Sequence, residues 1–593
     1  MKNTLNKPKA YLCVCLLLLA ISCGKKKDNY TSINLINKEI QKLYKKHLLS
    51  TVNYLDSINT HENIKDKKKH YLNARKNFKF LEPILAYSDK NNYKSLNAPN
   101  ILIVKGEESL DTRVMNPIGF QVLEETLYED SLDTLALTNL VSVTSARLKL
   151  IKNNVVLQLK DYHIIWLLRE HITRIATTGI TGFDSPVLNE SLKESIYTYK
   201  TVLDILKISE SKFSSKDVLN RFIKLIEEAK EKLTYDYDTF DRYSFIKNCI
   251  SKQLKALLEV QKDWKVKFPF EMALSNTMTE LFSKKTLNKT YFSDVKNDTI
   301  FLEEKIKFGK QLFNDVTLSK QSNMSCATCH VKDLGFADGK RTFNKHQTRN
   351  TPTVTYAAYQ RGFFMDSRAG SLEGQVVGVV KNHNEFDMSM DSVVARVMNK
   401  DIYRLKIKKL YKNKRIGYNI RHAIASYVRT LNTFNSKFDK NIRSEVNTLS
   451  EEEKNGFNLF MGKALCATCH FAPVFNGTVP PNYNDTELEA IGTPDIDTTK
   501  LSKDLGRFYL YNTEERKHFF KTPTIRNIAK TAPYMHNGVY KTLEEVVNFY
   551  NKGGGVGLGF NLPNQTLPFD ELNLSDKEIK EIVAFMKTLT DEY

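Results

Sequence analysis

The chain has 593 residues, of which 41% are hydrophobic and 26% are charged, and its formal net charge at pH 7 is +20. This length is several times that of a typical domain, and the composition excludes a disordered or collagen-like polypeptide. The positive charge is spread over both halves of the chain, so it suits an acidic protein partner or a membrane face as well as nucleic acid. We expect a multidomain globular protein and no nucleic-acid partner.

The N-terminus predicts export. A lysine-containing start precedes an apolar run, Tyr11–Ile21, of about half the length that spans a bilayer. The run ends in Ala20-Ile21-Ser22-Cys23, which resembles the lipobox of bacterial lipoproteins, with Ala20 where leucine is usual. This resemblance implies a signal peptide over residues 1–22, a lipid on Cys23, and a mature protein anchored to a bacterial membrane in the periplasm or at the cell surface. A plain secretory signal is the alternative.

Residues 23–265 carry helical patterns. After Ser214 and Asp217, which are spaced as a capping box, apolar residues recur every three or four positions. This pattern predicts an all-α accessory domain over residues 23–265. The polar, Asn- and Lys-rich residues 266–297 are expected to be a linker.

One stretch of the accessory domain, Gly119-x-Gln121-x-x-Glu124, resembles the GxHxxE signature of imelysin-like helical domains. Gln121 stands where that signature has its histidine, so a metal role is not carried over. A turn followed by an ordinary helix explains the stretch equally well. The function of this domain therefore stays open.

Two copies of one cysteine motif indicate the chemistry, namely Cys326-Ala327-Thr328-Cys329-His330 and Cys466-Ala467-Thr468-Cys469-His470. The C-x-x-C-H spacing lets two thiols form thioethers with haem while the adjacent histidine binds the iron. A Cys₂His₂ zinc site would need a second histidine pair, and a redox cysteine pair would not need the histidine. The sequence therefore predicts two covalently bound c-type haems. Cys249 stands alone and is expected to be a buried apolar residue.

The pattern of the second half of the chain predicts two small helical haem domains. Ser450 and Glu453 form a capping box before the second motif, and Ser575 and Glu578 form another before the closing helix. A helix, a haem motif and a closing helix are typical of cytochrome c domains. We predict a mainly α protein with one haem domain at residues 298–445 and another at 446–593.

From about residue 298 to 591 the chain resembles bacterial di-haem cytochrome c peroxidases and their MauG relatives. The matching stretches, in the family's order and spacing, are FGKQLFNDVTLSKQSNMSCATCH, GFADGK, RNTPTV, FFMDSRAGSLEGQ, NEFDM, KALCATCH and KTPTIRNIAKTAPYMHNG. The resemblance implies two cytochrome c domains, a peroxidatic haem with His330 as proximal ligand, and an electron-transfer haem with His470. It also implies that Gln375 and Glu385 are the distal glutamine and the acid–base glutamate.

The same resemblance raises the question of the second ligand of the electron-transfer haem. Conventional peroxidases have a methionine fourteen residues after the histidine of PY-x-H-x-G, and that position, counted from His536, is Tyr550. MauG-type proteins use a tyrosinate there, whose hard anionic oxygen favours higher iron states. Tyr550 is thus expected to be the distal ligand, with simple packing beside the haem as the alternative.

Three further positions differ from the family. Met365 stands where a tryptophan usually lies between the haems, so electrons would pass by another route. Val379 replaces a distal proline. His346 lies in the loop from which a histidine caps the resting haem of reductively activated peroxidases, four residues nearer Asn350 than expected. It either caps the iron or lies at the surface.

Calcium is also implied, on the side chain of Asn350 and the carbonyls of Thr531 and Pro533, because amide and carbonyl oxygens suit a hard cation. The function expected from all of this is reduction of hydrogen peroxide with electrons from a small cytochrome or cupredoxin. The alternative is a MauG-like enzyme that oxidises side chains of a protein partner. An electron-transfer cytochrome without turnover is a third possibility and would need two six-coordinate irons.

Overall fold

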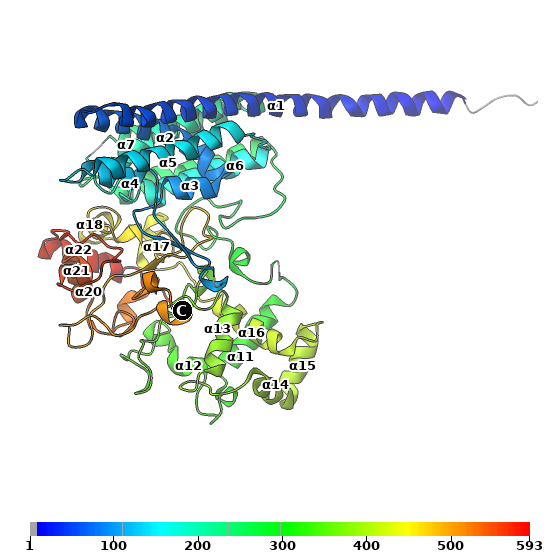
Figure 1. Ribbon diagram of the computed structural model, residues 1–593. Coiled ribbons are helices and arrows are strands. Elements are labelled where there is room, and N and C mark those ends of the chain that lie inside the picture. Colours follow the sequence, from blue (N-terminus) through cyan, green and yellow to red (C-terminus); the bar gives the residue numbers. More distant parts are fainter. Residues whose placement is uncertain (1–8, 110, 235, 297) are drawn as a thin grey trace, which may run out of the picture.

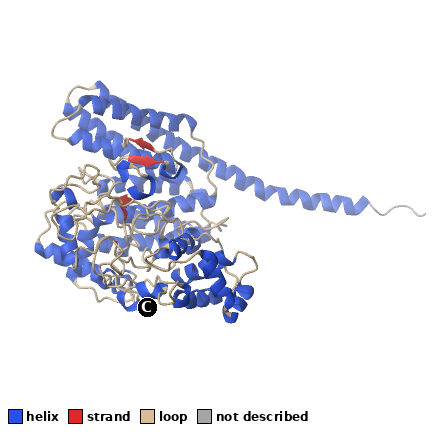
Figure 2. Cartoon of the chain, turned by 60° about the horizontal axis from the view of Figure 1, so that its bottom comes forward, coloured by secondary structure: helices blue, strands red, loops and turns tan. Residues whose placement is uncertain are grey.

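The helices up to Asp263 form a layer above the domains of the cysteine motifs, and the N-terminal part of α1 extends beyond this layer (Figure 1). The computed structural model describes residues 9–109, 111–234, 236–296 and 298–593, with side chains from residue 33 onward except that of Ser109. Within these residues the structure is mainly helical, and the paired strands form two short antiparallel sheets (Figure 2). The mainly α fold predicted from the sequence is confirmed.

Long amphipathic helices build the upper layer. Asn63 and Asp133 cap two of them by accepting hydrogen bonds from the backbone N–H groups of Lys65 and Ala136. The helices are α1 (Lys9–Thr60), α2 (Ile64–Ser88), α3 (Lys90–Leu96), α4 (Phe120–Tyr128), α5 (Thr134–Asn154), α6 (Asp161–Arg174), α7 (Ser191–Ile208), α8 (Lys216–Lys232), α9 (Arg242–Phe245) and α10 (Ser251–Asp263), with π-helical turns at η2 (Ile175–Gly179) and η4 (Ile246–Ile250).

The capping box predicted from Ser214 and Asp217 is wrong. Helix α8 begins at Lys216 with Ser215 as its N-cap residue, and no side chain caps it. The backbone N–H groups of Ser214 and Ser215 instead donate to the carboxylate of Asp263, at the end of α10. A distant carboxylate thus accepts the hydrogen bond that Asp217 would accept in the predicted box.

A β-hairpin leaves the upper layer and reaches down to the lower one (Figure 1). Strand β1 (Ile103–Lys105) pairs with β2 (Arg113–Met115) in antiparallel register, with Val104 opposite Val114. The 3₁₀ turn η1 (Glu107–Ser109) follows β1. The hairpin therefore carries residues of the accessory layer to the haem domains.

The lower layer contains the two predicted haem domains, each with one cysteine motif. In the first, the helices are α11 (Leu302–Phe313), α12 (Cys326–Cys329), α13 (Leu372–Lys381), α14 (Met390–Asn399), α15 (Asp401–Leu410) and α16 (Ile416–Val428). Helix α17 (Lys437–Ile442) lies before the predicted boundary at residue 446 but packs in the core of the second domain. The second domain continues with α18 (Glu451–Met461), α19 (Phe508–Tyr511), α20 (Leu543–Asn551), α21 (Gly554–Gly557), α22 (Asp576–Lys587) and the strand pair β3 (Leu488–Glu489) and β4 (Phe520–Lys521).

Each haem domain is closed by one pair of crossing helices, α11 with α16 and α18 with α22. A glycine lies at each crossing. A Cβ on Gly309 would come within 1.8 Å of the carbonyl oxygen of Ala423, and a Cβ on Gly456 within 1.8 Å of that of Glu581. Only glycine lets these backbones approach so closely. The two capping boxes predicted ahead of α18 and α22 are confirmed.

One apolar core continues from the upper layer into the second haem domain, whereas the first haem domain has a core of its own. Described residues of the predicted linker, 266–297, take part in the shared core. The ring of Phe282 lies 5.0 Å from that of Phe438 and 5.6 Å from that of Phe475, measured between centroids. The accessory layer is thus packed firmly on the second haem domain.

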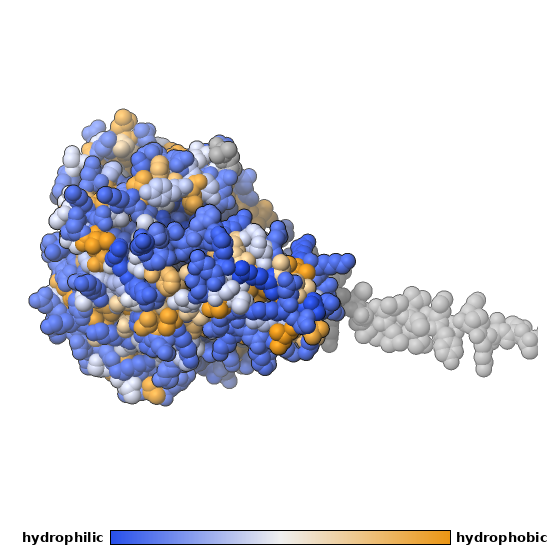
Figure 3. All heavy atoms as spheres, turned by 90° about the horizontal axis from the view of Figure 1, so that it is seen from below, coloured by the Kyte–Doolittle hydropathy of each residue, from blue (hydrophilic) through white to orange (hydrophobic). Residues whose placement is uncertain are grey.

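Among the residues that the structure describes, no helix combines the length and apolar character needed to cross a membrane. Seen from below, the surface is mostly hydrophilic, with apolar residues in small scattered groups (Figure 3). The predicted signal peptide falls partly on residues 1–8, which lie outside the described residues. Cys23 lies in the part of α1 whose side chains are not described, so its lipidation stays a prediction.

Candidate haem sites

The first cysteine motif forms a single capped helical turn. Ser325 precedes α12 and its backbone N–H donates to Oγ1 of Thr328 over 2.9 Å. His330 follows the turn, and its Nδ1–H donates to the carbonyl of Phe336 over 3.0 Å. The carbonyl can only accept, so this bond leaves Nε2 of His330 as the unprotonated nitrogen available to a metal.

A cavity of about 480 Å³ opens beside this motif. The thiols of Cys326 and Cys329 and the ring of His330 lie at its wall, and neither cysteine forms a disulfide. The remaining wall is largely apolar, with Phe313, Leu318, Val354, Phe363, Val376, Val380 and Ile424 among the lining residues. Two free thiols, an oriented imidazole and apolar walls fit a covalently bound haem.

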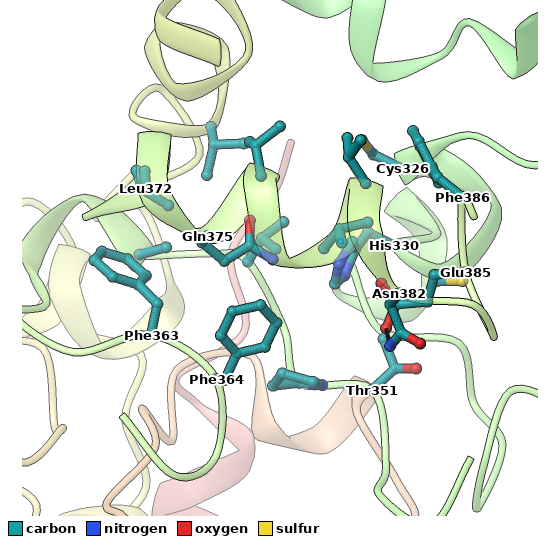
Figure 4. A pocket seen from close by; sticks show the side chains of 18 of the residues that line it. Cys326, His330, Thr351, Phe363, Phe364, Leu372, Gln375, Asn382, Glu385 and Phe386 are labelled. Atoms are coloured by element: carbon teal, nitrogen blue, oxygen red, sulfur yellow. Dashed lines mark hydrogen bonds between the residues drawn. The ribbon is translucent and has the colours of Figure 1, made fainter. Parts of the chain in front are cut away.

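Gln375 and Glu385 face the same cavity. Gln375 projects from α13, and Figure 4 shows its side chain and that of His330 pointing into one hollow. Glu385 is half-buried beside Asn382, whose amide donates to Oε1 of Glu385 over 2.9 Å. The structure therefore brings together the two residues predicted as catalytic with the predicted proximal ligand.

Burial raises the pKa of Glu385 above its ordinary value. Arg368, Asn382 and Gln347 oppose this effect, because a positive charge and donated hydrogen bonds favour the carboxylate. The guanidinium of Arg368 lies 3.6 Å from the ring centroid of Phe364, so an aromatic ring holds it in place.

Gln347 is a site residue that the sequence analysis missed. It lines the cavity and hydrogen-bonds to Glu385, while its Oε1 is buried without a hydrogen-bond partner. The adjacent His346 is exposed at the rim of the cavity. The sequence analysis identified this loop, but it named His346 and not the neighbouring Gln347 as the candidate site residue.

The second motif forms a 3₁₀ turn, η9 (Cys466–Thr468). The ring of His470 donates from Nδ1 to the carbonyl of Phe475 over 3.2 Å, as His330 does in the first site. Burial lowers the pKa of His470 to about 4, so the imidazole is neutral at pH 7. The motif thus presents a neutral imidazole and two free thiols.

Tyr550 lies on α20, close to the thiols of the second motif. Burial raises the pKa of its hydroxyl, and the charges that Cys469, Cys466 and Glu489 carry when ionised raise it further. Glu489 is itself desolvated, and its pKa is raised to about 7. Tyr550 therefore lies near the second haem position, and without a metal its phenol keeps its proton.

Strand β4 connects the two sites. Its Phe520 stacks on His536 with 3.9 Å between ring centroids, and the backbone N–H of Lys521 donates to the carbonyl of Met365 over 2.7 Å. Met365 and Lys521 both line the first cavity. Strand β4 thus borders the first cavity and carries an aromatic ring stacked on His536.

The residues predicted to bind calcium lie in two loops beside the first site. The backbone N–H of Asn350 donates to the carbonyl of His536 over 2.6 Å, and its side-chain amide donates to the carbonyl of Lys340 over 2.8 Å. The Oγ1 of Thr531 donates to the carbonyl of Ile528. In the described part of the chain no three His, Cys, Asp or Glu side chains are grouped to hold a metal ion. The calcium prediction relies on amide and carbonyl oxygens, including that of Pro533, and stays a prediction.

The imelysin-like stretch has a structural explanation. Gln121 donates from Nε2 to the carbonyl of Asn97 over 2.9 Å. The buried carboxylate of Glu124 accepts hydrogen bonds from Tyr71, Ser185 and the backbone of Val187 and Leu188. Both side chains tie helix α4 to its neighbours. Cys249 is buried in the accessory layer, as predicted.

Comparison with known proteins adds independent support. Residues 303–447 match the family model of di-haem cytochrome c peroxidases. A cytochrome-c peroxidase, IdrP2, of Denitromonas iodatirespirans is 31% identical over 311 residues, which cover 48% of this chain and 82% of the relative. The methylamine utilization protein MauG of Methylorubrum extorquens is 33% identical over 297 residues, covering 49% and 79%. Cytochrome c551 peroxidase of Nitrosomonas europaea is 32% identical over 293 residues, covering 48% and 80%.

Proposed function

The chain belongs to the di-haem cytochrome c peroxidase family, and on this premise we propose how its own residues reduce hydrogen peroxide with electrons from a small redox protein. Members of this family carry two c-type haems. The observation that carries the proposal is the single cavity shared by His330, Gln375 and Glu385, next to the thiols of Cys326 and Cys329.

This cavity would hold the peroxidatic haem. Cys326 and Cys329 would form the thioether bonds, and His330 would bind the iron through Nε2 while Phe336 fixes the orientation of its ring. When bound, the haem supplies an iron that accepts electrons and can bind peroxide on its open face. The apolar walls limit water in the cavity and so strengthen the polar contacts within it.

Glu385 would move the proton that peroxide reduction requires. The carboxylate takes a proton from one oxygen of hydrogen peroxide and returns it to the other, so that the O–O bond breaks with loss of water. Two electrons and two protons in all convert one peroxide into two waters. Gln375 donates an amide hydrogen bond that orients the peroxide for this transfer.

The balance of forces on Glu385 suits this role. A carboxyl with a raised pKa is a stronger base than an exposed glutamate, and it also gives its proton back at neutral pH. Asn382, Gln347 and Arg368 keep it from becoming permanently protonated. Burial therefore raises the pKa of Glu385, while the neighbouring charge and the donated hydrogen bonds lower it.

The second site would deliver the electrons. His470 and the thiols of Cys466 and Cys469 would hold the electron-transfer haem, with Tyr550 as the distal ligand. A small cytochrome or cupredoxin is the proposed donor, because the second domain offers one haem to an external partner and the first keeps one for peroxide. Electrons would pass between the sites through the region of Phe520, His536 and Met365.

Calcium and a membrane anchor complete the proposal. Calcium would bind the amide oxygen of Asn350 and the carbonyls of Thr531 and Pro533, where it would join the two loops beside the first site.

Lipidation of Cys23 would anchor the exported enzyme to a bacterial membrane. The N-terminal motif supports the anchor, and the family's chemistry is compatible with an exported location.

Steady-state assays on the holoenzyme test this function. A reduced small cytochrome should be oxidised only when hydrogen peroxide is present, at a rate that saturates with peroxide. Electron paramagnetic resonance of the oxidised protein should show one high-spin ferric haem with an open face. Two low-spin haems that stay low-spin after half-reduction, together with no peroxide turnover, would instead identify a plain electron carrier.

Tyr550 favours one alternative, a MauG-like oxidation of a protein partner. A tyrosinate ligand stabilises oxidised iron, which suits an enzyme that stores oxidising equivalents. The Tyr550→Met variant separates the two functions. A peroxidase should keep or gain turnover with the reduced cytochrome, whereas a MauG-like enzyme should lose oxidation of its protein substrate and show a changed low-spin signal.

A further inference from the structure

The β1–β2 hairpin of the accessory layer places one buried carboxylate against the second haem domain. Glu107 is 7% exposed and follows β1 in the turn η1, whereas the next residue, Glu108, has an exposed side chain. Oε2 of Glu107 accepts from Nε of Arg507 over 3.0 Å, and Oε1 accepts from Nε of Arg516 over 2.6 Å. Both arginines belong to the second haem domain.

Arg507 carries this contact on to the first haem domain. Its Nη1 donates to the carbonyl of Ser367 over 2.9 Å and to that of Asp366 over 3.2 Å. One guanidinium therefore joins Glu107 to a loop of the other domain. The accessory layer, the second haem domain and the first meet at this residue.

The loop that Arg507 holds, Phe363–Arg368, forms part of the wall of the peroxide cavity. Phe364 has φ of 64° and Ser367 has φ of 58°, a region that residues other than glycine rarely adopt. Backbone of this kind persists only where surrounding contacts hold it. Met365, which stands at the family's inter-haem position, lies between these two residues.

Contacts that do not involve Arg507 hold other groups of this loop. The carboxylate of Asp366 accepts from Arg349 over 2.6 Å and from Arg368 over 2.8 Å. The carbonyl of Met365 accepts from the backbone of Lys521. The carbonyls of Asp366 and Ser367 depend on Arg507, so their placement depends on where its guanidinium is held.

The charge of Glu107 fixes that guanidinium. Arg507 is 9% exposed, and a buried arginine requires an anionic partner. Glu108 is 4.0 Å away and exposed, so solvent weakens its attraction. Without the carboxylate of Glu107, Arg507 would shift toward water or toward other acceptors and release the two carbonyls.

We propose that Glu107 is a positioning residue for peroxide reduction. Its carboxylate holds Arg507, and Arg507 holds the Phe363–Arg368 loop at the wall of the first cavity, so the accessory layer helps to shape the site. The inference rests on the proposed assignment of the first cavity as the peroxidatic site. It gives the accessory domain a role in the reaction, since the loop forms one wall of that cavity and carries Met365, the position that the family resemblance places between the haems.

The test compares Glu107→Gln with Glu108→Gln in the holoenzyme with both haems. Glutamine keeps the shape of the side chain and removes its charge, and Glu108 is the matched control because it lies next in the same turn. Three readouts are followed: the high-spin signal of the oxidised peroxidatic haem, the rate of electron transfer between the haems after rapid reduction, and kcat and KM for peroxide.

We expect Glu107→Gln to slow inter-haem transfer at least threefold, to change the high-spin signal, and to alter kcat more than KM. Glu108→Gln should match the wild type in all three. Arg516→Gln should have a smaller effect than Glu107→Gln, because Arg516 does not contact the loop. A folded Glu107→Gln protein with the spectrum and transfer rate of the wild type would overturn the proposal.

The test remains decisive if the Glu107→Gln protein does not fold or if the wild type does not reduce peroxide. If Glu107→Gln does not fold, Arg507→Met, which removes the donor to the carbonyls of Asp366 and Ser367 and leaves Glu107 paired with Arg516, takes its place, and wild-type spectra and transfer in that protein would overturn the proposal. If the wild type itself reduces no peroxide, the proposed function fails. The inter-haem transfer rate and the haem signal then still decide the role of Glu107, because neither requires turnover.

Discussion

The amide of Asn382 donates a hydrogen bond of 2.9 Å to Oε1 of Glu385, three residues further along the chain. The backbone N–H of Glu385 in turn donates to the carbonyl of Asn382 over 3.0 Å. One residue thus fixes both the backbone and the carboxylate of the proposed acid–base group. The catalytic carboxylate is held by its own turn and adjusted by groups from other segments, and this arrangement leads to the first two predictions.

Replacing the Glu385 carboxylate should abolish proton transfer and leave haem binding intact. We expect Glu385→Gln to lower kcat for peroxide by about 10²- to 10⁴-fold, the range typical of a lost general acid–base group. The absorption spectrum and haem content should stay as in the wild type. In the wild type, activity should fall as the pH drops through a pKa above that of an ordinary glutamate, since burial raises the pKa of Glu385 and protonation removes the base. The pH profile of kcat/KM for peroxide checks this, and an acid limb at or below the position expected for an exposed glutamate would contradict it.

Removing Gln347 should move that acid limb. Its hydrogen bond favours the charged carboxylate, so Gln347→Leu should raise the pKa of Glu385 further and shift the limb to higher pH. His346→Ala is the matched control from the same loop and should leave the profile unchanged, because His346 is exposed. A shift in the histidine variant alone would assign the role to His346 instead.

The buried ion pair between Arg526 and Asp439 should be essential for stability. Arg526 donates to Asp439 over 2.8 Å and 3.0 Å and also to the carbonyl of Pro473, with both side chains fully buried. Asp439→Asn leaves an arginine without its counter-charge and should lower the free energy of unfolding by about 3–5 kcal/mol. Denaturant unfolding followed by circular dichroism measures this. The exposed pair Lys94–Asp485 is the comparison, and Asp485→Asn should cost about 1 kcal/mol or less.

The accessory layer should lose stability on acidification. Asp184 is buried between Lys79 and Arg174, at 2.8 Å and 2.7 Å, and their charges hold its pKa well below the ordinary value. A lowered carboxyl pKa contributes stability that is complete above the unfolded pKa of about 3.9 and disappears as the pH falls toward the folded one. Urea unfolding between pH 5 and pH 2 should therefore show a steep loss. Asp184→Asn should be less stable at pH 7 and should show a weaker dependence below about pH 4.

The sequence by itself determined the chemistry and the local structure. The two C-x-x-C-H motifs and the capping boxes at Ser450 and Ser575 could be predicted directly, since each signal lies within a few neighbouring residues, whereas Gln375 and Glu385 were implied only by the family resemblance. Thioether formation, ligation by an adjacent histidine and helix capping are short-range effects.

The tertiary structure determined the contacts between residues that lie far apart in the chain. At the expected capping box, Asp263 and not Asp217 accepts from the backbone N–H of Ser214. Gln347 rather than His346 contacts Glu385, and the expected linker packs Phe282 into the core of the second domain. Glu107 meets Arg507 across 400 positions of the chain. Such contacts arise when burial brings together residues with no local relation, and a buried charge then selects whichever partner the fold places beside it.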